Sequence, residues 1–343
     1  MDIKIERNVS LAGLTTFRIG GPASCFCVVK SAEELLEATS FAVKEKLPIF
    51  VLGGGSNLLV SDRGFQGLVI KNEILGIEFL DETRNEVAVN VGSGESWDGL
   101  VALLARKNLW SLENLSFIPG TVGGAVVQNA GAYGVEQKDC FENVEVFDTK
   151  SGKVKTLSKK DCEFGYRESV FKRGSGERYF ILSARYLLKK KAKPRIDYGD
   201  LREVFKAEEI GRIGIAQVRD VIGQIRSKKL PNLNETGTAG SFFKNPIIGK
   251  KSFDVLKKKY PALAGFPQKG GRVKISLAWV IDNLCDMKGV RQGKIGVYEK
   301  HSLVLVNYGG ATFKDTCALA EKIRESVHNK ISIDPEQEVV VVQ

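Results

Sequence analysis

Apolar runs bounded by polar residues and glycines recur along the chain. Runs of this length, followed by turn residues, are typical of strands. The predicted strands lie at residues 23–29, 49–52, 68–70, 87–91 and 179–188. Two segments that mix apolar and polar residues, 143–148 and 153–157, flank the turn segment Thr149-Lys-Ser-Gly and predict a β-hairpin.

Other segments place apolar residues at helical spacing. The segment from Ser31 to Lys44 begins with the Ser-x-x-Glu pattern of a capping box, and the segment from Ser96 to Lys107 also begins at a capping residue. Further helices are predicted near 215–225, 276–284 and 313–329, and an apolar strand near 339–342. Strands and helices in this mixed order indicate α+β or α/β domains.

Composition narrows the class of protein. Of the 343 residues, 43% are hydrophobic and 27% are charged, which is typical of globular domains. No apolar run approaches the roughly 20 residues of a membrane span. The start of the chain also lacks the apolar segment of a secretory signal. We therefore expect a cytoplasmic protein without membrane insertion.

The formal net charge of +10 is compatible with anionic partners. No nucleic-acid motif accompanies the lysine runs near 189–193 and 257–259, so we expect phosphate-bearing small molecules and no nucleic-acid partner. The six cysteines lack the spacing of a disulfide framework, and no His lies near Cys25 and Cys27 to complete a zinc site. We expect reduced, packed thiols and no metal.

The first segment with chemical content is Val51-Leu-Gly-Gly-Gly-Ser-Asn-Leu-Leu. Glycines after a buried strand let successive backbone N–H groups approach a ligand, and such a nest suits a pyrophosphate. An ordinary glycine-rich turn is the alternative. The segment lacks the G-x-G-x-x-G spacing of the dinucleotide fingerprint.

The second segment runs from Phe117 to Gly134 and contains five glycines among small residues, at positions 120, 123, 124, 131 and 134. A chain with so few side chains can pack closely against a flat ring or a phosphate. Tight helix packing would explain the small residues, but not the presence of Pro119, Gln128 and Asn129 among them.

With these two segments, Thr16-Phe-Arg-Ile-Gly-Gly-Pro-Ala completes a pattern that resembles the UDP-N-acetylenolpyruvoylglucosamine reductases of peptidoglycan precursor synthesis. The resemblance runs from end to end of the chain. Its other motifs are Gly165-Tyr-Arg-Glu-Ser, Tyr198-Gly-Asp-Leu, Lys229-Leu-Pro, Gly240-Ser-Phe-Phe-Lys-Asn-Pro and His301-Ser-Leu-Val-Leu-Val-Asn. The tyrosine segment resembles the form of the family with an extra tyrosine loop over the substrate.

The resemblance implies an α+β fold, with an FAD-binding fold of the vanillyl-alcohol-oxidase type in two subdomains and a C-terminal α+β substrate-binding domain. We expect subdomain 1 at residues 1–75, subdomain 2 at 76–226 and the substrate-binding domain at 227–330. The last strand, in 331–343, is expected to return to subdomain 2.

The resemblance also implies an activity. We expect an FAD-dependent oxidoreductase that uses NADPH to reduce UDP-N-acetylglucosamine enolpyruvate to UDP-N-acetylmuramate. FAD would be bound non-covalently. Two other interpretations remain open: an oxidase of the same fold with covalently tethered flavin, and a binding protein that does not consume NADPH. The sequence does not fix the oligomeric state, and we favour a monomer.

Three residues match the family's catalytic positions. Arg167 matches the arginine that holds the developing enolate charge, and its guanidinium can grip a carboxylate with two hydrogen bonds. Ser241 matches the serine that protonates the substrate carbon. The third is a glutamate, for which direct register in Asp334-Pro-Glu-Gln-Glu-Val favours Glu336 while the added Gln337 makes Glu338 a competitor.

The remaining matches are binding residues. Tyr198, Lys229 and Asn245 match residues for the substrate diphosphate and sugar, while His301 is given no role in proton transfer. The residues expected to bind FAD are Gly53, Gly54, Gly55, Ser56, Asn57, Ile118, Pro119, Gly120, Gly123, Gly124, Gln128, Asn129 and Gly131.

Overall fold

The computed structural model describes residues 3–173, 178–206 and 210–343. The chain divides into two compact units that each combine segments from different parts of the sequence. Unit 1 consists of Met1–Val9, Ala23–Gly54 and Gln66–Ser227, and unit 2 of Ser10–Pro22, Gly55–Phe65 and Lys228–Gln343.

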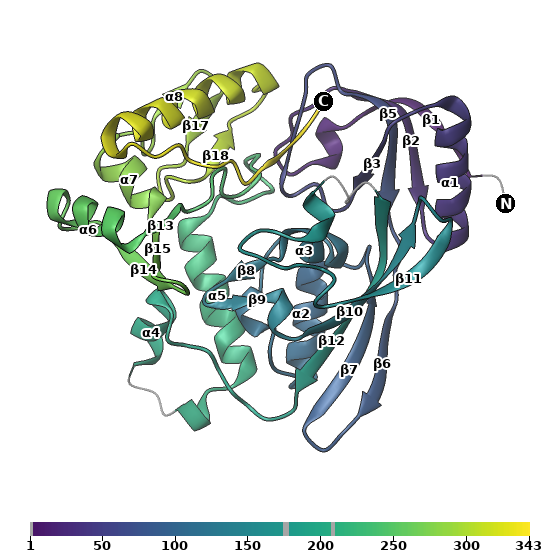
Figure 1. Ribbon diagram of the computed structural model, residues 1–343, viewed down its shortest axis with the longest axis horizontal. Coiled ribbons are helices and arrows are strands. Elements are labelled where there is room, and N and C mark those ends of the chain that lie inside the picture. The colour runs from purple at the N-terminus through teal and green to yellow at the C-terminus, as the bar shows by residue number, and fades with distance from the viewer. Residues whose placement is uncertain (1–2, 174–177, 207–209) are drawn as a thin grey trace. The chain divides into compact units, whose positions relative to one another are not determined.

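The first sheet of unit 1 has the strand order β1-β2-β5-β3, and helix α1 (Ala32–Glu45) packs on it (Figure 1). Ser31 caps α1, since its side chain accepts a hydrogen bond from the Glu34 N–H. Cys25 and Cys27 lie buried between sheet and helix, as the alternation of the strand predicts. The strands are β1 (Glu6–Ser10), β2 (Pro22–Val29), β3 (Ile49–Leu52) and β5 (Phe65–Asn72).

The second sheet of unit 1 is antiparallel where its pairings are described, in the order β11-β10-β12-β7-β6. Helices α2 (Trp97–Arg106) and α3 (Val122–Gln128) pack on one face, where Trp97 and Tyr186 meet edge to face. The predicted hairpin is confirmed by β10 and β11. The strands are β6 (Ile77–Glu82), β7 (Glu86–Gly92), β10 (Phe141–Asp148), β11 (Lys153–Ser158) and β12 (Tyr179–Lys189).

The rest of unit 1 packs around helix α5 (Ile215–Lys229), which buries the predicted apolar face at Ile215, Val218, Ile222 and Ile225. Helix α4 (Gly199–Phe205) contributes Leu201 and Phe205 to the same cluster. The short strands β8 (Gly131–Ala132) and β9 (Val135–Glu136) pair with each other in the second glycine segment.

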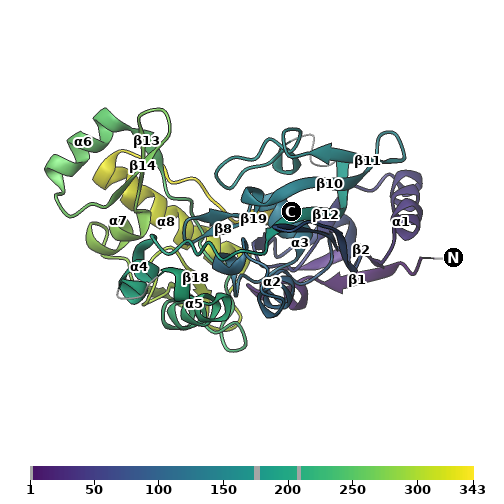
Figure 2. The same cartoon turned by 90° about the horizontal axis from the view of Figure 1, so that it is seen from below.

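Unit 2 is built around helices α7 (Leu277–Asn283) and α8 (Phe313–Ile331), both close to prediction. Helix α6 (Lys250–Lys259) packs on a three-stranded sheet, as Figure 2 shows. The strands of unit 2 are β4 (Leu58–Val60), β13 (Ile247–Gly249), β14 (Gly265–Gln268), β15 (Arg272–Ile275), β16 (Arg291–Gln292), β17 (Ile295–Val297), β18 (Leu305–Asn307) and β19 (Val340–Val342).

The C-terminal strand differs from expectation. We expected it to return to residues 76–226, but β19 pairs in parallel with β4 inside unit 2. An apolar run identifies a strand without naming its partner. Residues 10–22 and 55–65 also belong to unit 2, because Phe17, Ile19 and Leu59 are buried in its core. The predicted division at 75/76 and 226/227 remains a prediction.

Candidate active site

The first glycine segment begins where β3 ends, and its first two glycines contact the second segment. A Cβ on Gly53 would lie 2.7 Å from Thr121 Oγ1, and one on Gly54 would lie 2.5 Å from Gly120 Cα. A side chain at Gly54 would therefore require the backbone to move, and one at Gly53 would require the Thr121 side chain to move. The two segments identified in the sequence are thus brought into direct contact within unit 1.

The continuation of this segment belongs to unit 2. Gly55 has a φ of +64°, and a Cβ there would clash with the backbone of Leu14. Asn57 fixes the C-terminal segment: its Nδ2 donates to the Glu338 carbonyl at 3.1 Å, and its carbonyl accepts from Val340 N at 3.0 Å. The segment from Gly53 to Asn57 therefore crosses from one unit to the other.

The second glycine segment contains α3, a helix that the sequence did not predict. Thr121 caps it by accepting a hydrogen bond from Gly124 N. Gly123 N donates to Ser93 O at 2.8 Å, and a Cβ on Gly123 would lie 3.1 Å from that same oxygen. Glycine thus permits the helix to begin in close contact with the chain after β7. Ile118 and Pro119 lead into this turn, and Gly120 has a φ of +118°.

Gln128 and Asn129, both predicted to bind cofactor, have different surroundings. Asn129 has no exposed surface, ends α3 in the left-handed conformation and donates to Gly165 O at 2.8 Å. Its side chain therefore supports the fold. The Oε1 of Gln128 is buried and accepts no hydrogen bond from the residues that the structure describes. Gln128 thus offers a buried acceptor to a ligand with an N–H group.

Asn72, at the end of β5, stabilises the second segment and was not predicted. Its Nδ2 donates to Ser93 Oγ at 2.7 Å, and its Oδ1 accepts from Ile74 N at 3.0 Å. Ser93 Oγ in turn donates to Ile181 O at 2.7 Å. This buried network holds the Ser93 backbone that Gly123 contacts.

Arg167 lies beside the second glycine segment. It has a φ of +56° in a tight turn in which Gly165 and Glu168 exchange backbone hydrogen bonds. Its guanidinium donates to Gly131 O at 2.7 Å. A predicted catalytic cation is therefore placed against a predicted cofactor-binding residue, although 36 positions separate them in the sequence.

Tyr198 belongs to an aromatic and cationic cluster with two residues that were not predicted. Its ring meets that of Tyr133 edge to face, with centroids 6.2 Å apart. The Tyr133 hydroxyl is hydrogen-bonded to Arg226, and burial raises the pKa of this hydroxyl. Burial also lowers the pKa of the Arg226 guanidinium. Only the position of Tyr133 in the glycine segment could have pointed to it.

In unit 2, the segment with Ser241 runs antiparallel to the segment with the two candidate glutamates. Phe243 pairs with Gln337, Lys244 N donates to Glu336 O, and Glu338 N donates to Phe242 O. The Glu336 carboxylate forms an ion pair with the ammonium of Lys244, which is 5% exposed. The Glu336 side chain itself is 68% exposed, whereas Glu338 is half-buried.

Other residues of unit 2 that the sequence singled out have contacts of their own. Asn245 Oδ1 accepts from Leu277 N at 3.0 Å and so supports the start of α7. Lys229 ends α5 and is exposed. His301 Nδ1 accepts from Leu303 N at 3.3 Å.

The two glycine segments fit FAD. Backbone N–H groups around Gly53, Gly54 and Gly120 can serve its pyrophosphate. The small residues of the second segment leave room for a flat ring, and the unsatisfied oxygen of Gln128 matches the single ring N–H of a flavin. Among the described residues, no cluster of three or more His, Cys, Asp or Glu side chains could hold a metal.

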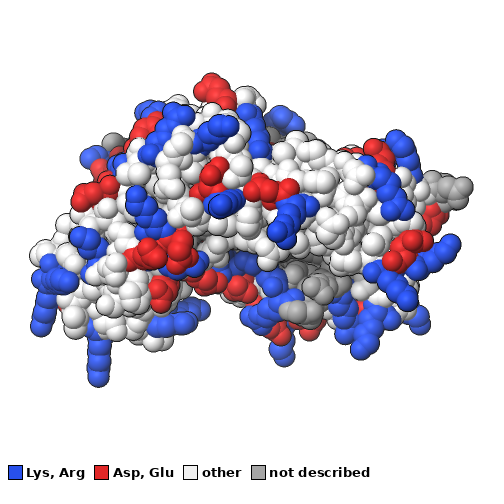
Figure 3. Space-filling model, turned by 90° about the horizontal axis from the view of Figure 1, so that it is seen from above, with Lys and Arg blue, Asp and Glu red and all other residues white. Residues whose placement is uncertain are grey.

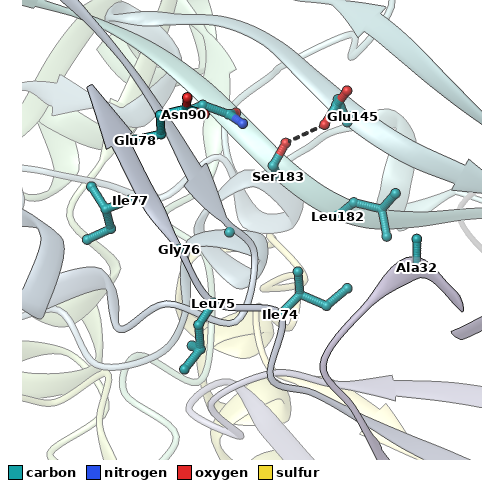
Figure 4. Close-up of a pocket in the computed structure, with 11 residues that line it drawn as sticks. Ala32, Ile74, Leu75, Gly76, Ile77, Glu78, Asn90, Glu145, Leu182 and Ser183 are labelled. Atoms are coloured by element: carbon teal, nitrogen blue, oxygen red, sulfur yellow. Dashed lines mark hydrogen bonds between the residues drawn. The ribbon is translucent and has the colours of Figure 1, made fainter. Parts of the chain in front are cut away.

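A pocket of about 490 Å³ lies elsewhere on unit 1. Its lining comes from Ala32 at the start of α1, from the link between β5 and β6, and from strands β6, β7, β10 and β12. Figure 4 shows Ser183 and Glu145 directed at each other, and their hydrogen bond measures 3.0 Å. The lining residues are a different set from those predicted for the active site.

Comparisons with known proteins agree with this arrangement. The model of an FAD binding domain matches residues 23–158, and that of the UDP-N-acetylenolpyruvoylglucosamine reductase C-terminal domain matches 232–342. The UDP-N-acetylenolpyruvoylglucosamine reductase of Ralstonia nicotianae is 41% identical over 98% of this chain and 99% of its own. That of Pseudomonas aeruginosa is 38% identical over 98% and 99%.

A solved structure supports the fold. The crystal structure of UDP-N-acetylenolpyruvylglucosamine reductase from Thermus caldophilus has a TM-score of 0.68 and 28% sequence identity, covering 99% of this chain and 100% of that one. The predicted α+β class with an FAD-binding fold is thereby confirmed. The chain belongs to the UDP-N-acetylenolpyruvoylglucosamine reductase family and is an FAD-dependent oxidoreductase of peptidoglycan precursor synthesis.

Proposed function

We propose that this chain reduces UDP-N-acetylglucosamine enolpyruvate to UDP-N-acetylmuramate with NADPH as reductant, and that Arg167, Ser241 and a C-terminal glutamate act on the substrate. The observation that carries the assignment of roles is the guanidinium of Arg167 at 2.7 Å from Gly131 O, in the segment that fits a flavin ring. FAD, when bound, would supply the hydride chemistry that connects NADPH with the vinyl group of the substrate.

Gly53, Gly54, Gly55, Ser56 and Asn57 would hold the pyrophosphate side of FAD, and residues from Ile118 to Gly131 would hold the ring. The cofactor is bound without a covalent link in this proposal. Four of the cysteines, at positions 25, 27, 140 and 162, are buried, and burial raises the pKa of the Cys27 and Cys162 thiols to about 12, so neither is an activated nucleophile. Flavin that stays attached after denaturation would contradict this point.

Arg167 would hold the substrate carboxylate. A guanidinium stays charged at any physiological pH and can donate two parallel hydrogen bonds to a carboxylate. Charge that develops on the carboxylate during hydride addition would then be stabilised by a cation that the turn from Gly165 to Glu168 has already oriented.

Ser241 would donate the proton to the carbon next to the carboxylate. Its hydroxyl is a weak acid, so the donation depends on a site with charged neighbours and little water. Three residues later, Lys244 is almost completely buried and forms an ion pair with Glu336, so charged groups do lie in the same segment.

For the third role we favour Glu338 over Glu336. The carboxylate of Glu336 is neutralised by Lys244 and largely exposed. Glu338 is half-buried, and the hydrogen bonds of its backbone to Phe242 and Asn57 fix it on both sides. Glu338→Gln should therefore slow reoxidation of reduced enzyme by the UDP-sugar strongly, and Glu336→Gln only slightly. Rapid-mixing absorbance at the flavin band distinguishes them, and the reverse order would return the role to Glu336.

Tyr198, Lys229 and Asn245 would bind the diphosphate and sugar of the substrate. Tyr198 is 43% exposed although its ring contacts Tyr133, so one of its faces can meet a ligand. The protein would act as a cytoplasmic monomer without a nucleic-acid partner. No helix in the described ranges has both the length and the apolar character to cross a membrane.

The test follows the two half-reactions separately. NADPH added without oxygen should bleach the flavin of wild type and of Ser241→Ala at similar rates. The UDP-sugar should then restore the spectrum of the wild type, while Ser241→Ala recovers about a hundredfold or more slower, because a general acid typically contributes that much. An undiminished rate in Ser241→Ala would refute its role. Bleaching without recovery in the wild type would refute the substrate.

A further inference from the structure

Lys71 lies at the carboxyl end of β5, beside the first glycine segment. Strands β3 and β5 are parallel, and the register pairs Lys71 with Leu52, the last residue of β3. The chain therefore enters Gly53 next to the Lys71 side chain, whose ammonium donates a hydrogen bond to the Gly53 carbonyl oxygen. The carboxyl ends of parallel strands are where ligands of such sheets commonly bind.

This hydrogen bond fixes the direction of the peptide between Gly53 and Gly54. A trans peptide is planar, and its N–H points to the side opposite its carbonyl oxygen. Every peptide in the described ranges is trans. With the carbonyl directed at Lys71, the Gly54 N–H is directed away from it, and neither glycine has a side chain that could hold this orientation.

Burial of the Lys71 ammonium costs free energy, because the charge is partly removed from water. Lys71 is half-buried, and burial lowers the pKa of its ammonium, while the nearby carboxylate of Glu73 acts in the opposite direction. A single carbonyl offsets only part of the cost of removing a charge from water. A bound anion next to the segment would offset more.

We propose that Lys71 is a positioning residue for FAD, which holds the Gly53–Gly54 peptide with its N–H presented to the FAD pyrophosphate and supplies a positive charge at this end of β5. The inference deepens the proposed function, because it assigns the residue that pre-organises the anion nest. It predicts a contribution to binding of the pyrophosphate part of the cofactor and not of its ring.

The experiment compares FAD with riboflavin, which has the ring but lacks the pyrophosphate. Apoprotein of the wild type, Lys71→Met, Lys71→Arg and Lys71→Gln is titrated with each flavin, and quenching of flavin fluorescence gives Kd. Lys153→Met, an exposed lysine on β11 of the same unit, is the matched control. The thermal midpoint of each apoprotein reports on folding.

Lys71→Met should raise the Kd for FAD about tenfold, the effect of losing one charge-assisted hydrogen bond, and leave the Kd for riboflavin within about twofold of the wild-type value. Lys71→Arg, which keeps donor and charge, should recover most of the affinity, and Lys153→Met should match the wild type. Lys71→Gln replaces Lys71→Met if the latter does not fold, with the same criterion.

An FAD Kd unchanged in Lys71→Met, or equal weakening for FAD and riboflavin, would overturn the inference, since the second result indicates general damage to the fold. Failure of the proposed function is distinguishable. A wild type that binds FAD but does not turn over the UDP-sugar would contradict the proposed reaction while the comparison of the Lys71 variants still decides the inference.

Discussion

Individual residues near the two glycine segments adopt backbone conformations that their side chains disfavour. Phe117, Asn129, Tyr133 and Arg167 all have positive φ. Such conformations cost roughly 1–3 kcal/mol each and persist where surrounding contacts enforce them. Asn129 is held by its bond to Gly165 O, and Arg167 by its bond to Gly131 O. Three of these four residues, Phe117, Asn129 and Tyr133, lie within the second glycine segment, so its path depends on the contacts around it.

Asp148, at the β10–β11 hairpin, is a buried carboxylate on which several hydrogen bonds converge. Its carboxylate has no exposed surface, and Arg178 donates two hydrogen bonds to it, both of 2.8 Å. Lys155 and Ser151 also donate to Asp148 Oδ2. We predict that Asp148→Asn lowers the thermal midpoint at pH 7, because the amide cannot accept all of these bonds and leaves Arg178 without its counter-charge. Asp81→Asn is the control. Asp81 also pairs with an arginine, Arg185, but the Asp81 side chain is 83% exposed, so its loss should have little effect on the thermal midpoint.

The same carboxylate predicts a pH dependence. The hydrogen bonds of Arg178 and Lys155 hold the pKa of Asp148 far below its usual range. A carboxyl whose pKa is lower in the folded state stabilises that state when the pH is above the pKa of the unfolded chain, which is about 3.9 for Asp. This stabilisation is lost as the pH falls below that unfolded-state pKa. The difference in thermal midpoint between wild type and Asp148→Asn should therefore be constant from pH 7 to about 5 and shrink below about pH 4. A difference that widens in acid would contradict this sign.

At the scale of elements, α5 anchors the start of the second glycine segment. Arg219 on α5 donates two hydrogen bonds to Asp98, of 2.7 and 2.9 Å, and its guanidinium lies 4.3 Å from the centre of the Phe117 ring. Asp98 also accepts from Phe117 N. Phe117 immediately precedes Ile118 and Pro119, so α5, α2 and the cofactor segment are joined at one point.

Arg219→Gln should therefore loosen this segment. We expect the free energy of unfolding to fall by about 1.5–3 kcal/mol, the range for hydrogen bonds to charged groups, and the Kd for FAD to rise measurably. Denaturant unfolding and flavin titration test both effects. Arg106→Gln, at the exposed end of α2, is the control and should change neither. Unchanged FAD affinity in Arg219→Gln would show that the anchor serves stability alone.

Most of the longer helices and strands could be predicted because their patterns are local. Ser31 and Ser96 cap helices as their sequence motifs indicate. Helix α3 could not be predicted, since Gly123 and Gly124 disfavour a helix and only the contact with Ser93 explains Gly123. Helix α6 has apolar residues at Phe253 and Leu256, but its lysines near 257–259 entered the prediction only through their charge.

In the site, too, features with a local pattern could be predicted, and features that depend on contacts distant in sequence could not. The glycine segments were recognisable because glycine is favoured where another part of the chain comes too close for a side chain, as Thr121 does at Gly53 and Gly120 does at Gly54. The supporting residues were not recognisable. Asn72 acts through Ser93, 21 positions away, and no local motif distinguishes it from any other asparagine at the end of a strand.

At the scale of the whole molecule, the candidate residues are divided between the two units. Gly53, Gly54, the second glycine segment, Arg167 and Tyr198 belong to unit 1, whereas Ser241, Asn245 and both glutamates belong to unit 2. The proposed catalytic roles are assigned to residues of both units. Variants at Ser241 or Glu338 should leave FAD binding and its reduction by NADPH intact, because neither residue is among those proposed to hold the cofactor.

The net charge of +10 gives a prediction for the molecule as a whole. Lys and Arg side chains are spread over the face drawn in Figure 3, with Asp and Glu among them. The proposed ligands carry phosphates, and the UDP-sugar also a carboxylate, so a positive field should favour their encounter with the protein.

Raising ionic strength shortens the Debye length from about 30 Å at 0.01 M to about 10 Å at 0.1 M. We therefore expect kcat/KM for the UDP-sugar to fall several-fold over this range, with kcat almost unchanged because bound substrate no longer depends on long-range attraction. Steady-state kinetics in NaCl and in potassium acetate separates screening from specific anion binding. A kcat/KM independent of salt would show that the excess positive charge plays no part in capturing the substrate.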